Sequence, residues 1–335
     1  MKLLVFSAKE FEKPFLYKAN QERFTMHFTE DALDTHTAQK AVGYDAISIF
    51  SGDDASLLVL EKLHDLGVKY IAIRAAGYNN IHIKAAKRIG LKVANVPEYS
   101  PHAIAEHATA LLLALARKIV QADRQVQKDN FLLDELMGFN LHGKTIGIVG
   151  TGRIGTVMAK IMNGFGCRIL AHDPVPNKSL SELDLVKYVS IEELCKESDV
   201  ISLHIPLTYE NFYFFDKEKL GWMKPSAILV NTARGAVVQT NVLIEALERG
   251  QIAGYAADVY EKERGLFFRD HSGKGISDER FKKLRELPNV LITPHQAFVT
   301  EEALKNIAEM TMENLSAWDK NLPCKNELGK ETMMS

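Results

Sequence analysis

Short apolar runs alternate with longer segments of helical spacing through the first hundred residues of the chain. Residues 3–6 (L-L-V-F), 46–50 (A-I-S-I-F), 70–74 (Y-I-A-I-R) and 92–96 (K-V-A-N-V) are rich in aliphatic side chains and short enough to be buried strands. Intervening segments such as 56–66 repeat apolar residues at the three- and four-residue spacing of a helix. This alternation predicts βαβ units that build a parallel sheet.

A second series of the same kind begins at Lys144 and predicts six more strands. They are T-I-G-I-V, R-I-L-A-H, D-V-I-S-L-H, A-I-L-V-N, A-G-Y-A-A and N-V-L-I-T, between residues 145 and 293. Six strands fit one doubly wound sheet. A helix from about His102 to Gln121, introduced by Pro101, separates the two series, and another from about Glu301 to Lys320 follows the last strand.

Composition narrows the class of protein without naming a function. A length of 335 residues favours two lobes over a single core. Lys and Arg number 41 against 43 Asp and Glu, so no global basic field exists to hold nucleic acid or an anionic membrane. The longest apolar stretch, 108–116, is about half of a membrane span, and we expect a cytoplasmic protein. The three cysteines lack metal-ligand spacing, so we expect reduced thiols and no metal site.

The string G-T-G-R-I-G, residues 150–155, is weak evidence alone but follows one predicted strand and opens a helix. Gly150 permits a tight turn, Gly152 lets the backbone approach a pyrophosphate, and Gly155 allows close packing of helix on strand. Asp173 ends the next strand, where it can accept hydrogen bonds from an adenosine ribose and repel a 2′-phosphate. This context predicts NAD in preference to NADP, although a solvated acid at the strand end is the simpler alternative for Asp173.

Three further polar segments follow later strands, at the sheet edge where open α/β sheets bind ligands. N-T-A-R-G carries Arg234, whose guanidinium can grip a carboxylate through two hydrogen bonds. A-D-V-Y-E-K-E-R-G carries three acids, Asp258, Glu261 and Glu263, and T-P-H-Q-A-F carries His295. A surface arginine or a structural histidine would be the ordinary interpretation of each residue alone. Together they suit hydride transfer, because histidine titrates near neutral pH and a carboxylate on its other nitrogen favours its charged form.

An ordered set of segments across nearly the whole chain resembles the D-isomer-specific 2-hydroxyacid dehydrogenases, and above all their fermentative D-lactate dehydrogenase branch. The segments are R-A-A-G-Y-N-N-I (74–81), V-P-E-Y-S-P-H-A-I-A-E-H (96–107), G-K-T-I-G-I-V-G-T-G-R-I-G (143–155), D-V-I-S-L-H-I-P-L-T (199–208), N-T-A-R-G (231–235), D-V-Y-E-K-E (258–263) and T-P-H-Q-A-F (293–298). The stretch 265–281 is similar to an insertion typical of the D-lactate branch.

The resemblance implies a role for each matching residue. His295 would be the acid/base, Glu263 its carboxylate partner and Arg234 the clamp for the substrate, while Asp258 would support the nicotinamide side and Glu261 would be solvated. Implied cofactor contacts are Gly150, Gly152, Arg153, Ile154, Gly155, Asp173, His204, Pro206, Thr232, Ala233, Arg234 and Asp258. Implied substrate contacts are Ala75, Ala76, Gly77, Tyr99, Arg234, His295 and Phe298; for Tyr99 and Phe298, plain core packing is the alternative.

The resemblance also implies an α/β fold of two doubly wound parallel-sheet domains with a cleft between them. Residues 100–298 would form a Rossmann-type NAD-binding domain, and residues 1–99 with 299–335 a smaller, flavodoxin-like substrate domain. Helix 102–121 contributes to a dimer interface in relatives, so we expect a homodimer or homotetramer.

The function expected from the resemblance is the reversible, NADH-dependent reduction of pyruvate to D-lactate. Alternatives within the class are a bulkier 2-oxo acid, hydroxypyruvate or formate, although the formate-oxidising relatives lack the acid that Glu263 would supply. An alternative from another class is a corepressor that keeps the fold and the NAD site but acts by binding proteins.

Overall fold

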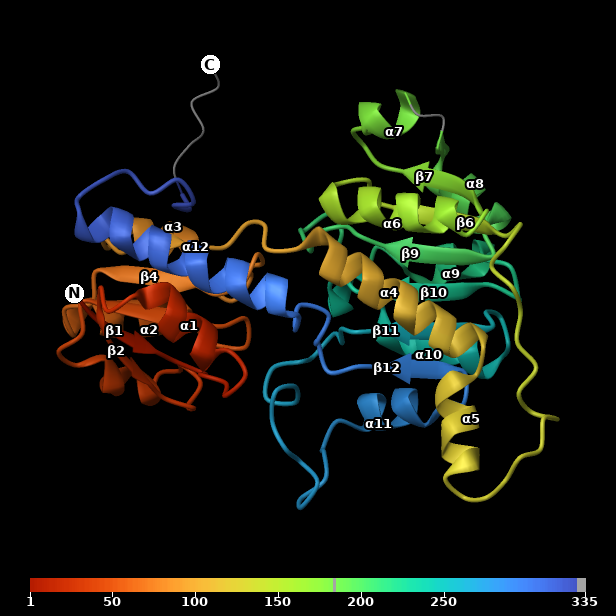
Figure 1. Ribbon diagram of the computed structural model, residues 1–335, viewed down its shortest axis with the longest axis horizontal. Helices are drawn as coiled ribbons and strands as arrows, with labels where there is room; N and C mark the ends of the chain where they lie inside the picture. Colours follow the sequence, from red (N-terminus) through yellow and green to blue (C-terminus); the bar gives the residue numbers. More distant parts are fainter. Residues whose placement is uncertain (183–184, 330–335) are drawn as a thin grey trace. The chain divides into compact units, whose positions relative to one another are not determined.

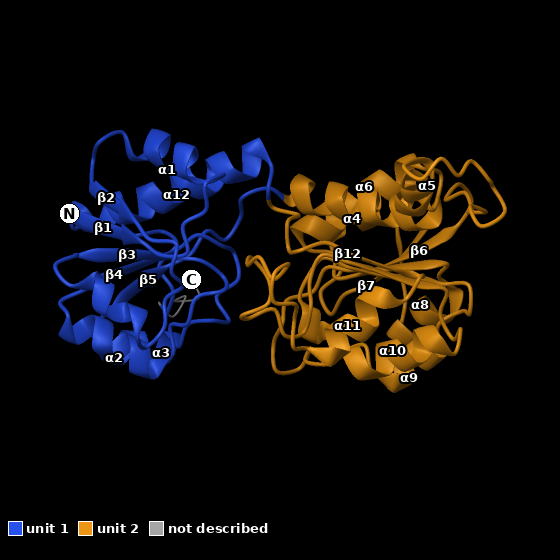
Figure 2. Ribbon diagram, turned by 90° about the horizontal axis from the view of Figure 1, so that it is seen from below, with its two compact units in different colours: residues 1–100, 299–335 blue, residues 101–298 orange. Residues whose placement is uncertain are grey.

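The chain forms two compact units, coloured separately in Figure 2. The computed structural model describes residues 1–182 and 185–329. One unit comprises Met1–Ser100 with Val299–Ser335, and the other comprises Pro101–Phe298. Residues 330–335, the end of the predicted substrate domain, lie outside the described residues.

The first unit is built on a sheet of five parallel strands in the order β2-β1-β3-β4-β5, the order of flavodoxin-like folds (Figure 2; β1, β2 and β4 are also labelled in Figure 1). The strands are β1 (Lys2–Val5), β2 (Thr25–Phe28), β3 (Ala46–Ile49), β4 (Tyr70–Ile73) and β5 (Lys92–Ala94). Helices α1 (Lys13–Asn20) and α12 (Glu301–Asp319) cover one face of this sheet, and α2 (Leu57–Asp65) and α3 (Ile83–Arg88) cover the other (Figure 2). A 3₁₀ turn, η1, spans Thr37–Ala41.

The second unit contains seven parallel strands in the order β12-β11-β10-β9-β6-β7-β8. The strands are β6 (Thr145–Val149), β7 (Arg168–His172), β8 (Lys187–Tyr188), β9 (Val200–Leu203), β10 (Ile228–Asn231), β11 (Gly254–Ala257) and β12 (Val290–Ile292). The order reverses between β6 and β9, and ligands of such sheets bind at the carboxyl ends of the strands beside this reversal.

Helices lie on both faces of the second sheet (Figure 2). On one face lie α4 (Pro101–Ala116), α5 (Ile119–Val126) and α6 (Arg153–Gly164). On the other lie α8 (Ile191–Glu197), α9 (Lys217–Trp222), α10 (Thr240–Glu248) and α11 (Glu279–Glu286). The shorter elements are α7 (Lys178–Glu182) and the 3₁₀ turn η2 (Gly235–Val237).

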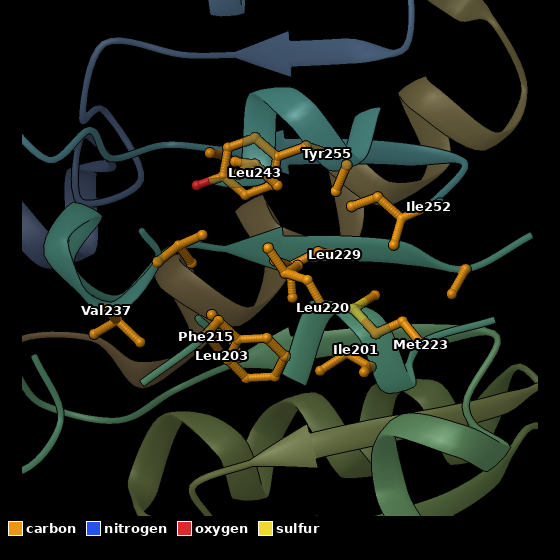
Figure 3. Close-up of a cluster of buried hydrophobic side chains, with 14 of the residues drawn as sticks. Ile201, Leu203, Phe215, Leu220, Met223, Leu229, Val237, Leu243, Ile252 and Tyr255 are labelled. Carbon is orange, nitrogen blue, oxygen red and sulfur yellow. The ribbon is translucent and has the colours of Figure 1, made fainter. Parts of the chain in front are cut away.

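Strands β9, β10 and β11 are buried along their whole length, as expected of a parallel sheet covered on both faces. Figure 3 shows one side of this core, where Leu203, Phe215, Leu229 and Tyr255 pack with residues of α9 and α10. Truncating one such side chain to alanine costs about 2–5 kcal/mol. This core fixes the strand ends from which the polar segments project.

The predicted α/β class with two parallel sheets is confirmed, with differences at the edges and at one helix. The half-buried strand β2 and the two-residue strand β8 were not predicted. The helix predicted to reach Gln121 ends at Ala116, where the N–H of Phe139 bonds the carbonyl of Ala116 and Lys118 has a φ of 57°. No helix within residues 1–182 or 185–329 has the length and apolar character that a bilayer crossing requires.

Candidate active site

The turn between β6 and α6 contains the three glycines of the sequence motif, and each meets a different steric condition. Gly150 has a φ of 91°, and a Cβ there would lie 2.7 Å from the carbonyl oxygen of His204. A Cβ at Gly155 would lie 1.9 Å from the carbonyl oxygen of Gly150, so the helix can approach the turn only without a side chain. A Cβ at Gly152 would meet no atom within 4 Å. The backbone at Gly152 is therefore open to a ligand, at a helix N-terminus that favours an anion.

Asp173 lies just after β7 and bonds the glycine turn directly. Its Oδ2 accepts hydrogen bonds from the backbone N–H (2.6 Å) and the hydroxyl (3.1 Å) of Thr151, and its Oδ1 accepts one from Val175 N–H (2.9 Å). Tyr188 donates its hydroxyl to Thr151 Oγ1 at 3.0 Å. The carboxylate is thus oriented beside the turn, where it can also accept from a ribose hydroxyl.

Other predicted cofactor residues lie at the ends of β9 and β10 and on the first turn of α6. Burial lowers the pKa of His204 to about 4, so its imidazole is neutral at physiological pH, and its Nε2 lies 2.9 Å from Ser202 Oγ. Thr232 is 7% exposed, and its Oγ1 has no hydrogen-bond partner among the described residues. A buried hydroxyl without a partner is costly, and a bound ligand would satisfy it. The remaining members of this set are Arg153, which is exposed, Ile154, Pro206 and Ala233.

Three features of this unit fit a dinucleotide: the open backbone at Gly152, the oriented carboxylate of Asp173 and the unsatisfied hydroxyl of Thr232. They follow β6, β7 and β10, whose carboxyl ends share one edge of the sheet. This edge is where a doubly wound sheet binds its cofactor.

Arg234 lies in a loop held by the last residue of β10. Asn231 accepts the N–H of Ala233 at 3.0 Å and donates its side-chain amide to the carbonyl of Arg234 at 3.0 Å. The guanidinium donates to Ala233 O at 2.7 Å, and no carboxylate in the described part of the chain forms an ion pair with it. A partly exposed, unneutralised guanidinium can bind a substrate carboxylate through two hydrogen bonds.

Gly235 brings the Arg234 loop into backbone contact with the loop that carries Glu263. A Cβ at residue 235 would lie 1.9 Å from the carbonyl carbon of Tyr260 and 2.3 Å from the nitrogen of Glu261. The two loops therefore approach each other more closely than any residue with a side chain at 235 would allow.

Glu263 and His295 form a hydrogen-bonded pair. His295 Nδ1 lies 2.7 Å from Glu263 Oε2, and the other carboxylate oxygen accepts the N–H of Tyr260 at 2.9 Å. The two side chains are 21% and 22% exposed. With Nδ1–H donated to the carboxylate, Nε2 is the nitrogen left to exchange a proton with a substrate.

Asp258, expected to support the nicotinamide side of the site, is 1% exposed and bonds the loop around His295 instead of projecting into solvent. It accepts hydrogen bonds from Thr293 Oγ1 (2.5 Å), Gln296 N–H (2.8 Å) and Ala297 N–H (2.8 Å). Burial by itself would raise the pKa of the Asp258 carboxyl, but these bonds and one from His107 outweigh it and hold the pKa below its ordinary value. The observed contacts of this carboxylate are therefore those of a residue that positions a loop.

The expectation that Glu261 is solvated is wrong. Its side chain is only 8% exposed, because Tyr213 donates its hydroxyl to Oε1 at 2.6 Å and the N–H of Thr240 points to Oε2 at 3.4 Å. Arg280 lies 3.9 Å from the same carboxylate. Glu261 thus ties the β11 loop to the segment before α9 and to the first residue of α10.

Aromatic rings flank His295, and the sequence predicted only one of them. Phe298 is 7% exposed, and its ring centroid lies 6.4 Å from that of His295. Phe268, which was not predicted, lies closer, at 5.8 Å. Its position in the 265–281 insertion was the available signal, since an insertion next to Glu263 would be expected to contribute to the same site.

The predicted substrate residues of the first unit lie at the carboxyl ends of its strands. Ala75, Ala76 and Gly77 follow β4 and are partly exposed, and the side-chain amide of Asn95 donates to Ala76 O at 2.7 Å. The carbonyl of Tyr99 accepts from the side-chain amide of Asn306 at 2.6 Å.

Comparison with known proteins shows that the chain is similar to dehydrogenases and reductases of 2-hydroxy and 2-oxo acids. The family model described as "D-isomer specific 2-hydroxyacid dehydrogenase, NAD binding domain" matches residues 109–297. The D-lactate dehydrogenase of Escherichia coli K12 is 46% identical over 98% of this chain and 100% of its own length, and an aromatic 2-oxoacid reductase of Clostridium sporogenes is 41% identical over 90% and 91%. The structure of the pyruvate reductase of Chlamydomonas reinhardtii superposes with a TM-score of 0.92 at 39% identity, covering 97% of this chain and 98% of that one.

Proposed function

Because the chain belongs to the D-isomer-specific 2-hydroxyacid dehydrogenase family, we propose that it catalyses the reversible reduction of pyruvate to D-lactate. It is an NAD-dependent oxidoreductase of 2-hydroxy acids, so the proposal concerns the identity of the substrate and the role of each residue. The proposed residue roles rest on one observation: His295 lies 2.7 Å from Glu263, in the same unit as an Arg234 that no carboxylate neutralises among the described residues.

NADH, when bound, supplies the hydride that C2 of the 2-oxo acid receives. Arg234 binds the substrate carboxylate and polarises the neighbouring carbonyl. Protonated His295 delivers its Nε2 proton to the carbonyl oxygen as the hydride arrives, and in the reverse direction it accepts the proton of the hydroxyl. Glu263 stabilises the imidazolium and keeps the ring oriented through Nδ1. A positioned acid of this kind contributes about 10²- to 10⁴-fold in rate.

A small apolar substituent on the 2-oxo acid agrees with the surroundings of His295. The ring centroids of Phe268 and Phe298 lie 5.8 Å and 6.4 Å from that of the imidazole, so apolar surface lies beside it. Pyruvate, with a methyl group, is the smallest such acid, and the names of the E. coli and Chlamydomonas relatives favour it. The aromatic 2-oxoacid reductase among the relatives makes phenylpyruvate the sharpest comparison.

The remaining expectations from the sequence belong to the same proposal. Residues 100–298 would bind NAD, and residues 1–99 with 299–335 would bind substrate. The backbone of Ala75, Ala76 and Gly77 would receive the carboxylate, and Tyr99 would contact the substituent. A homodimer or homotetramer is proposed from the resemblance of helix α4 to an interface helix.

The test is the loss of NADH absorbance when 2-oxo acids are added to the purified protein. We expect kcat/KM for pyruvate to exceed that for phenylpyruvate by at least tenfold, with 2-oxobutyrate and hydroxypyruvate between them. A preference for phenylpyruvate would instead make the chain a reductase of aromatic 2-oxo acids, as the Clostridium sporogenes relative is named. If the protein reduces none of these acids, the proposed mechanism is overturned and the protein-binding alternative is favoured.

A further inference from the structure

The backbone of His295 adopts a conformation that a residue with a side chain rarely holds unaided. Its φ is 58°, in the left-handed region, and its N–H bonds the carbonyl of Thr293 at 3.0 Å. Such a conformation costs about 1–3 kcal/mol and persists where surrounding contacts determine it. In this loop those contacts converge on one carboxylate, that of Asp258, which bonds the hydroxyl of Thr293 and the N–H groups of Gln296 and Ala297 on both sides of His295.

The carboxylate of Asp258, which holds this loop, is itself a buried charge and needs groups that compensate it. Asp258 is 1% exposed, and a buried carboxylate is stable only where donors or a cation compensate it. Among the described residues, the one basic side chain that contacts it is His107, whose Nε2 lies 3.4 Å from Asp258 Oδ1 and 3.0 Å from Thr293 Oγ1. The His107 side chain is 17% exposed.

The direction of these hydrogen bonds follows from the groups involved. An ionised carboxylate only accepts, so the single hydrogen of the Thr293 hydroxyl is donated to Asp258 at 2.5 Å. The hydroxyl oxygen must then accept at its 3.0 Å contact with His107. His107 Nε2 therefore carries a hydrogen, and a chain runs from His107 through Thr293 to Asp258.

His107 connects this chain to a rigid part of the fold. It lies on α4, whose inner face is buried through Ala105, Ala108, Leu111 and Leu112. These residues belong to the core formed with β6, β10 and β11. A side chain on such a helix fixes the position of a loop more firmly than a side chain on a neighbouring loop could.

We propose that His107 is a positioning residue, which holds His295 in its left-handed conformation through Thr293 and Asp258. This inference rests on the proposed role of His295 as acid/base. In this view, the orientation of the His295 ring depends on His107, although His107 is distant in sequence from the reacting groups. Loss of its Nε2–H should misplace His295 without altering the glycine turn that binds NADH.

The variants are His107→Phe, which removes the donor but keeps a planar ring, and His107→Gln, whose side-chain amide can donate to Thr293. His102→Phe is the matched control, because His102 is exposed on the same helix. All are assayed with whichever 2-oxo acid the wild-type enzyme reduces, so a failure of the proposed function would appear in the wild type itself. The NADH dissociation constant, from fluorescence quenching, and the thermal midpoint are measured in parallel.

We expect kcat of His107→Phe to fall about 10- to 100-fold, since small misplacements of catalytic groups have effects of this size, with the NADH dissociation constant within twofold of wild type. His107→Gln should restore kcat to within about fivefold of wild type, and His102→Phe should leave it unchanged. Retention of kcat in His107→Phe would overturn the proposal, as would a parallel loss of NADH binding or a failure of glutamine to rescue.

Thr293→Val tests the same chain if His107→Phe does not fold, because it removes the hydroxyl with little change of volume. It should lower kcat by a similar factor, and the double variant with His107→Gln should be no slower than Thr293→Val alone, since both act through one chain. Multiplicative losses in the double variant would show two independent effects and overturn the proposal.

Discussion

Replacing Gly235 by alanine tests whether backbone contact between two loops sets the spacing of the groups that carry the reaction. A Cβ at residue 235 would lie 1.9 Å from the carbonyl carbon of Tyr260, 2.1 Å from its oxygen and 2.3 Å from the nitrogen of Glu261. Cβ atoms essentially never approach other atoms closer than 3.0 Å. The Arg234 loop and the Glu263 loop must therefore separate by about 1 Å or more, because backbone cannot yield as a flexible side chain does.

Two effects of different size follow from that displacement. Overpacking of a buried site costs about 1–3 kcal/mol of folding free energy, which lowers the thermal midpoint by a few degrees. A shift of about 1 Å in a catalytic group can reduce the rate about 100-fold. We therefore expect Gly235→Ala to remain folded at 25 °C while its kcat/KM for pyruvate falls about 100-fold.

The assay is steady-state oxidation of NADH, with the thermal midpoint and the NADH dissociation constant measured on the same preparations. Gly164→Ala serves as the control, since a Cβ at the end of α6 would meet nothing within 4 Å. It should match the wild type in kcat/KM. If Gly235→Ala keeps kcat/KM within about threefold of wild type, the reasoning from loop contact to catalytic spacing is refuted.

Three further predictions concern charge. Glu263→Gln should move the basic limb of the pH profile of pyruvate reduction to lower pH, because in the proposed mechanism the carboxylate supports the protonated His295; an unmoved limb would remove Glu263 from the mechanism. Asp173→Ala should weaken NADH binding and reduce the ratio of kcat/KM for NADH to that for NADPH, and an unchanged ratio would make the residue purely structural. Burial lowers the pKa of His204 from 6.5 to about 4, so the folded chain binds fewer protons than the unfolded chain between these values and stability falls as the pH drops through them. His204→Gln should remove up to about 3 kcal/mol of this loss, measured by denaturant titration from pH 7 to pH 4; curves that stay parallel to wild type would contradict the assignment.

Elements with a strong hydrophobic period could be predicted closely from the sequence. The strand predicted at residues 168–172 coincides with β7, and the last helix, predicted to end near Lys320, ends at Asp319. Strand β2 was missed because its alternate residues are exposed or half-buried at the sheet edge, so the run T-M-H-F carries no continuous apolar signal. The end of α4 depends on Phe139, whose N–H bonds Ala116 from 23 residues further along the chain.

In the site, too, some features follow from local sequence and others depend on contacts between distant residues. Residues that follow strands, such as Arg234 and His295, could be placed at one sheet edge because parallel topology brings carboxyl ends together. The burial of Glu261 could not be predicted, since Tyr213 lies 48 positions away in sequence. The contact of His107 with Thr293 spans 186 positions and needs the packed helix α4 as its base. Local patterns indicate which residues can do chemistry, whereas the contacts that orient them are tertiary.

The return of the chain to the first unit has a consequence for biosynthesis. Leu3, Val5, Ala46 and Ala72 form one apolar face of the first sheet, and α12 covers that face through residues that include Trp318. This tryptophan is 1% exposed and stacks on Tyr70 at 5.2 Å. The part of this face that α12 covers therefore stays exposed in a nascent chain until residues 301–319 have been synthesised, by which time residues 101–298 can already have folded as a contiguous unit.

Fluorescence of the two tryptophans can distinguish the folding of the two units. Trp222 reports on the contiguous unit, residues 101–298, and Trp318 reports on the first unit. During refolding of variants that each keep one tryptophan, fluorescence from Trp222 should reach its native value before that from Trp318, because the first unit must join two segments separated by residues 101–298. The first unit is thus the later of the two to be completed as the chain is synthesised.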